Sequence, residues 1–120
     1  MSGLKGADQG VRETVNTVGT SGATQTLPDV TTATMHRVTL TANCTITLPT
    51  PAAGKSFTVE LVQDATGGRT VAWATPTGAI RWPGGTVPTI TAAANAIDVI
   101  SFVCIGGTNW YGFVGGQAMA

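Results

Sequence analysis

Alternation of apolar and polar residues is the clearest pattern in the chain. Between Val38 and Leu48 the even positions carry apolar side chains, and threonine or asparagine occupies the odd positions. A period of two residues is typical of a β-strand with one buried face and one face in water. The Ala42-Asn43 pair indicates a bend or bulge. The segment therefore predicts one interrupted strand or two shorter strands.

The rest of the chain shows the same kind of pattern in shorter pieces. Residues 55–63 alternate and predict a strand, the glycine-containing segment 64–68 predicts a hairpin turn, and residues 69–73 predict the returning strand. Residues 96–105 are apolar at both parities, which predicts a central strand covered on both faces. Shorter strands are expected at 80–82, 89–91 and 110–114.

About eight short strands separated by Gly/Pro turns predict an all-β fold. We expect a single β-sandwich or jelly-roll-like domain with an extended N-terminal arm. Residues 1–34 form the polar arm in this interpretation, with room for short strands, and residues 35–120 form the sandwich domain. No segment has a helical period of apolar residues, and we detect no internal repeat.

The composition excludes several classes of partner. Only 10% of the 120 residues are charged, against about 25% in typical soluble domains. Six basic and six acidic residues cancel, so the chain lacks the basic footprint that neutralises nucleic-acid phosphates. The longest apolar run, around residues 96–105, is interrupted by Asp98 and Ser101 and is too short to span a bilayer. We expect neither nucleic acid nor a membrane as partner.

Residues able to carry catalysis are few and scattered. His36 is the single histidine, and the six carboxylates show no local cluster. Asp98 is unusual, because it lies within the most apolar strand and needs either an exposed edge or hydrogen-bond donors. An enzyme would need carboxylates that converge around His36 or Asp98. We expect no catalytic residues, no metal and no cofactor.

The two cysteines fit neither a metal site nor a redox motif. Cys44 and Cys104 each lie in a strand-like segment, where buried free thiols act as small apolar side chains. A disulfide between them requires the fold to bring their Cα atoms within about 6 Å. Both alternatives stay open at the level of sequence.

The aromatic residues allow three interpretations. Trp73, Trp82, Trp110 and Tyr111 can fill the core, line a subunit interface or form a stacking platform for sugars. Nucleic-acid stacking is disfavoured by the lack of basic neighbours. The low-charge surface, rich in threonine and glycine, suits burial against other copies of the chain or against a large partner.

Four motifs in fixed order resemble a module of tailed-bacteriophage virion proteins. They read Q-D-x-T-G-x-R-T-V-x-W at 63–73, W-P-G-G-T-x-P at 82–88, A-N-x-x-D at 94–98 and G-x-x-W-Y-G-F at 107–113. The resemblance covers about residues 35–116. The module occurs in capsid decoration (cement) proteins and at the ends of tail-fibre polypeptides. It implies a structural protein of β-sandwich type, commonly trimeric.

Of these two locations, the sequence favours the outer surface of the capsid. We expect a non-enzymatic decoration protein that stabilises the shell by binding the major capsid protein as a homotrimer. The N-terminal arm would make the capsid contacts, through Val11, Arg12, Val15 and Val18. The alternative is a tail-fibre or head-fibre tip that binds glycans or the cell surface. In either case the candidate interface or surface-binding aromatics are Trp82, Trp110 and Tyr111.

Overall fold

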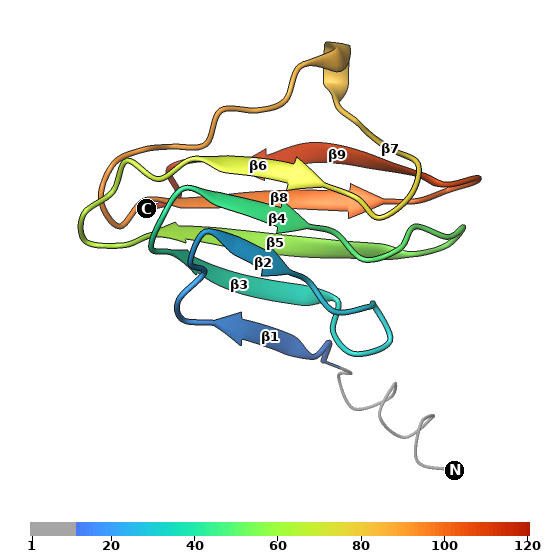
Figure 1. Cartoon of the computed structure of the whole chain (residues 1–120), viewed down its shortest axis with the longest axis horizontal. Helices are drawn as coiled ribbons and strands as arrows, with labels where there is room; N and C mark the ends of the chain where they lie inside the picture. Colours follow the sequence, from blue (N-terminus) through green and yellow to red (C-terminus); the bar gives the residue numbers. More distant parts are fainter. Residues whose placement is uncertain (1–11) are drawn as a thin grey trace.

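The computed structural model describes residues 12–120 (Figure 1). Within them the chain forms nine strands and one 3-10 turn, η1 (Pro83–Gly85). The strands are β1 (Val15–Val18), β2 (Thr24–Thr26), β3 (Met35–Leu40), β4 (Cys44–Thr47), β5 (Ser56–Gln63), β6 (Val71–Ala74), β7 (Ala79–Arg81), β8 (Ile97–Val103) and β9 (Asn109–Gly116).

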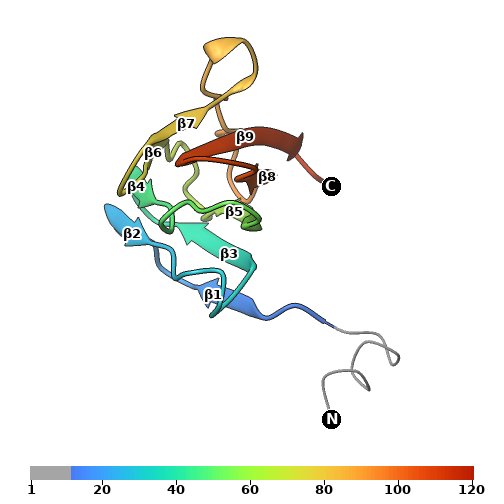
Figure 2. The ribbon, with the colours of Figure 1, turned by 90° about the vertical axis from the view of Figure 1, so that its right-hand side faces the viewer.

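The strands form two sheets that pack against each other. The large sheet has six strands in the order β1-β3-β5-β8-β9-β7, and the small sheet has three in the order β2-β4-β6. Figure 2 shows the large sheet curving around the small one. The alternating positions point their apolar side chains into the space between the sheets, where Val38, Leu40 and Ile46 are completely buried. The expected all-β sandwich is confirmed.

The first six strands alternate between the two sheets, so the chain crosses from one sheet to the other after each strand. β1, β3 and β5 pair in parallel in the large sheet, and β2, β4 and β6 pair in parallel in the small one. The bend at Ala42-Asn43 is thus a complete corner, because β3 and β4 belong to different sheets. This parallel connectivity was not predicted.

The expected hairpin at 64–68 is wrong, because β6 pairs with β4 and not with β5. Buried Gln63 explains the turn out of the large sheet. Its amide nitrogen donates to the carbonyl of Arg69 at 2.8 Å, and its amide oxygen accepts from the Arg69 backbone N–H at 3.1 Å. Asp64 then accepts from the backbone N–H groups of Thr66 and Gly67. These bonds hold the loop as a crossing between the sheets.

The segment from β1 to β6 also contains a short sequence repeat that the sequence analysis did not detect. Residues 24–28 and 45–49 both read Thr-x-Thr-Leu-Pro. The two segments lie side by side in the small sheet, with Thr24 opposite Thr45, and Leu27 and Leu48 are both buried. A five-residue motif within two different flanking sequences is too short to be recognised as a repeat from the sequence alone. It becomes evident only because the two copies lie side by side in the small sheet.

The C-terminal part of the large sheet is mostly antiparallel. β8 pairs antiparallel with β5 and with β9, while β7 pairs in parallel with β9. β8 is central, as expected, but only one of its faces is fully covered. Ile100 and Phe102 are buried, whereas Val99 and Val103 on the other face are only partly buried. The expectation of two covered faces is corrected, because no described segment forms a second layer there (Figure 2).

Much of the expected N-terminal arm belongs to the two sheets. β1 pairs with β3 and β2 pairs with β4, and Leu27 has only 2% of its surface exposed. The short strands for which the expected arm left room thus pair into both sheets. Of the candidate arm contacts, Val11 lies outside the described residues.

Aromatic side chains form the centre of the core between the sheets. Phe57 and Phe102 stack with ring centroids 5.0 Å apart, and Trp110 meets Phe57 edge-on at 4.9 Å. The completely buried Trp110 indole donates to the carbonyl of Pro49 at 2.9 Å. Cys44 and Cys104 are both buried and free, which resolves the question of a disulfide in favour of two thiols.

Candidate functional site

The side chain of the single histidine is buried against the aromatic core. His36 on β3 has 2% of its surface exposed, and its ring packs edge-on against Phe57. Its Nδ1 is 3.2 Å from the amide nitrogen of Asn16. Burial lowers the pKa of His36, so the imidazole is neutral at pH 7.

Asp98 on β8 holds two segments of backbone together. Its carboxylate accepts from the backbone N–H of Thr91 at 2.7 Å, from that of Ala118 at 2.9 Å and from the Gln117 side chain at 3.2 Å. Burial acts to raise the pKa of Asp98, but these hydrogen bonds outweigh it and leave the pKa below its ordinary value. Residues 89–91, expected as a strand, form an irregular segment anchored by this carboxylate.

The other described carboxylates also have separate partners, and Glu13 accepts a hydrogen bond from the Thr34 hydroxyl. Glu60 pairs with Arg37 at 3.0 Å, Asp64 with Arg69 at 2.9 Å and Asp29 with Lys55 at 2.6 Å. The hydrogen bond from Lys55, followed by those from Thr31, lowers the pKa of Asp29 to about 2. The described residues contain no group of three or more His, Cys, Asp or Glu side chains that could hold a metal ion. No helix in this part of the chain is long and apolar enough to cross a membrane.

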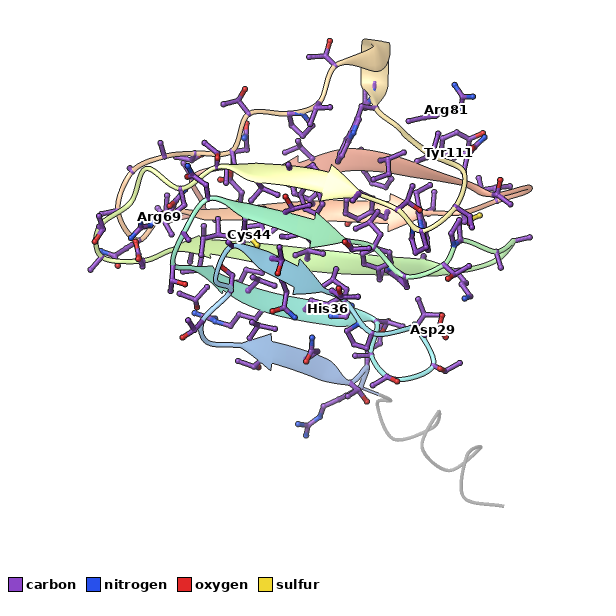
Figure 3. All side chains as sticks on the ribbon, viewed as in Figure 1. Asp29, His36, Cys44, Arg69, Arg81 and Tyr111 are labelled. Carbon is purple, nitrogen blue, oxygen red and sulfur yellow. The ribbon has the colours of Figure 1, made fainter. Side chains whose placement is uncertain are left out.

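The outer face of the large sheet, which we call the open face, presents apolar side chains to solvent. Register places alternate residues of β1, β3, β5, β8, β9 and β7 on it. Val15 is 54% exposed, Tyr111 42% and Phe113 41%. Arg37 and Glu60 form an ion pair within it, and Figure 3 shows Arg81 near Tyr111 at its β7 end.

The candidate arm residues divide between the two sides of the large sheet. Val15 lies on the open face, whereas Val18 points to the other side and packs against the core. Arg12 precedes β1 and is exposed. These residues therefore do not form one continuous contact surface.

A groove lies where the edges of the two sheets meet. β6 is one edge strand of the small sheet, β7 is one edge strand of the large sheet, and the groove between them has a volume of about 530 Å³. The chain segment that carries η1 borders it and projects from the body of the molecule (Figures 1 and 2). The groove is lined by Trp73, Thr75, Ile80, Arg81, Trp82, Gly85 and Val87.

Two tryptophans form walls of this groove. The rings of Trp73 and Trp82 lie 5.9 Å apart between centroids and are tilted by 54°. Trp82 lies against the backbone of β9 at Gly112, where an added Cβ would come within 2.5 Å of the indole ring. Glycine at this position therefore makes room for the indole. The indole nitrogen of Trp73 is buried and has no hydrogen-bond partner in the described structure.

The three candidate aromatics do not come together. Trp110 is completely buried in the core and is therefore unavailable as a surface aromatic, Tyr111 lies on the open face, and Trp82 lines the groove. Trp73, rather than either of them, is the partner of Trp82. No local signal could have paired positions 73 and 82, because Trp73 lies on β6 of the small sheet whereas Trp82 follows β7 of the large one.

A protein family model matches most of the chain. The family model described as "Putative phage tail fibre C-terminal domain" matches residues 25–110, which is more than half of the 120 residues. The matched segment runs from β2 into β9 and so includes strands of both sheets. No curated protein and no solved structure matches the chain.

Proposed function

We propose that this chain, which belongs to the phage tail fibre C-terminal domain family, is a non-enzymatic module of a tail fibre. In this proposal the module assembles with copies of itself and contacts the host surface. Membership of the family makes the chain a structural component of the virion. The match over residues 25–110 is the observation that carries the proposal, because it spans strands of both sheets.

The open face supports self-association. Exposed apolar side chains on a sheet face are stabilised when a second surface covers them. Arg37 and Glu60 on this face neutralise each other, so this pair adds no net charge to the surface that a second copy would meet. The resemblance to phage virion modules implies three copies. We therefore propose a homotrimer in which the open face is covered by neighbouring copies.

The mass of the assembly tests this proposal. Light scattering coupled to size-exclusion chromatography should give a trimer for the wild-type chain at micromolar concentration. Phe113→Glu places a charge on the open face and should give a monomer, because burying an unpaired carboxylate costs several kcal/mol. Ile105→Glu is the matched control, since Ile105 is 74% exposed in the turn after β8 and lies outside the strands of that face. A monomeric wild type would contradict the proposal.

Capsid decoration, which the sequence favoured, is the competing location in the virion. The matching family is described as a tail fibre domain, and the match does not support a location on the capsid. The two locations predict different copy numbers. Antibody labelling of intact phage should mark the tail, whereas co-sedimentation with expanded capsids lacking the protein should show no saturable binding. Hundreds of bound copies per shell would favour decoration through the major capsid protein instead.

A further inference from the structure

We infer that the groove between β6 and β7 is a saccharide-binding site, with Trp73 and Trp82 as its aromatic walls. The inference deepens the proposed function and rests on it, because a tail-fibre module that contacts a bacterium meets a surface rich in polysaccharide. The open face serves assembly in that proposal, and the groove adjoins it at β7, where Arg81 borders both surfaces.

The size and shape of the groove suit a sugar. Its volume of about 530 Å³ falls within the range of about 300–1,000 Å³ typical of small-molecule sites. The two indole rings are tilted by 54°, with Trp73 partly buried and Trp82 only 9% exposed, so they form a recessed, angled wall rather than a flat platform. The apolar C–H face of a pyranose ring can pack on such a wall while its hydroxyl groups point away from it.

The polar groups around the groove match the hydroxyl groups of a sugar. β6 pairs only with β4 and β7 only with β9, so each strand has an edge without a sheet partner. Backbone N–H and C=O groups on such edges can donate to and accept from hydroxyls. The Thr75 hydroxyl donates to the carbonyl of Thr77 and keeps lone pairs to accept.

The lining residues disfavour other ligands. They include no carboxylate and no second titratable group beside Arg81, which excludes a cation site and offers too little positive charge for a nucleic-acid backbone. An extended peptide would pair along a strand edge, but β6 has four residues and β7 has three. Strands this short offer few ladder hydrogen bonds, so a saccharide is favoured over a peptide.

The three tryptophans provide a direct readout with a built-in control. The protein is first screened on an array of bacterial surface polysaccharides, and oligosaccharides of a bound polysaccharide are titrated into 15N-labelled full-length protein. The indole N–H signals of Trp73 and Trp82 should shift. The signal of Trp110 should stay in place, because that N–H is buried and already bonded to Pro49.

Two matched variants localise the binding. Val87 is 51% exposed at the groove, so Val87→Arg should fill it without disturbing the core and weaken oligosaccharide binding at least tenfold. Ile105→Arg places the same side chain at a position that does not line the groove and should leave affinity within twofold.

Several results would overturn the inference. These are the absence of any bound polysaccharide, shifts confined to Trp110, undiminished affinity of Val87→Arg, or capture of unstructured peptides in place of glycans. The mass of the same samples is measured in parallel. A monomer that binds glycans refutes the proposed assembly alone, whereas a trimer that binds none refutes the groove alone.

Discussion

Replacing Asp98 by asparagine tests whether its buried carboxylate holds the C-terminal segment and residues 89–91 to the large sheet. Three donors converge on this side chain, at 2.7, 2.9 and 3.2 Å. An amide keeps one oxygen and presents an NH₂ group in place of the other. Whichever way it is oriented, the N–H of Thr91 or of Ala118 then faces a donor and loses its acceptor.

Two effects of the substitution lower the free energy of unfolding: one donor loses its acceptor, and the remaining hydrogen bonds go to a neutral oxygen. A buried donor without a partner costs about 1–3 kcal/mol, and hydrogen bonds to a neutral oxygen are weaker than those to a charged one by roughly 1 kcal/mol. Asp98→Asn should therefore lower the free energy of unfolding by about 2–4 kcal/mol at pH 7. In guanidinium chloride the unfolding midpoint should fall by roughly 0.5–1 M.

The dependence on pH gives the sharper test. The pKa of Asp98 in the folded chain lies below its ordinary value of 3.8, so its stabilising effect is present above pH 3.8 and is lost as the pH falls through the folded-state pKa. The difference in unfolding free energy between wild type and Asp98→Asn should thus narrow at pH 3. Asp29 and Asp64 titrate in both proteins and cancel in the difference.

Guanidinium unfolding curves of both proteins at pH 7, 5 and 3, followed by tryptophan fluorescence, measure this difference. Equal stability at pH 7 would refute the role of Asp98 as an anchor. A gap of the same size at pH 7 and pH 3 would show that the carboxylate charge contributes nothing.

Two further predictions concern the backbone and the thiols. Gly78 has a φ of +67°, and an added Cβ would come within 1.7 Å of a backbone oxygen, so Gly78→Ala should cost about 3 kcal/mol or more. Gly22→Ala is the control, since Gly22 shares the positive φ but has open space around it. This substitution should cost only about 1–2 kcal/mol. Thermal unfolding measures both losses of stability, and equal losses would contradict the steric argument. Cys44 and Cys104 are buried, and burial raises the pKa of the Cys44 thiol, so both should react with a thiol reagent only after denaturation. Rapid reaction of the native protein would contradict the burial of the thiols. Recovery of fewer than two thiols after denaturation without reductant would contradict their free state.

The local pattern was sufficient to predict most of the strands and the buried face of those that alternate. Alternation is a property of neighbouring residues, so Phe57, Val59 and Leu61 could be placed on one buried face before any partner strand was known. The scarcity of charge likewise led to the expectation of surfaces that meet other protein, which stays a prediction. These predictions needed no long-range information.

The tertiary structure alone decided which strands pair and therefore where the candidate sites lie. Parallel and antiparallel partners can satisfy the same alternating strand, so the loop at 64–68 could be taken for a hairpin although it crosses between sheets. Trp73 and Trp82 meet because two sheet edges converge, which no spacing along the chain records. Asp98 is accommodated in an apolar strand because Thr91 and Ala118, distant in sequence, bring their N–H groups to it.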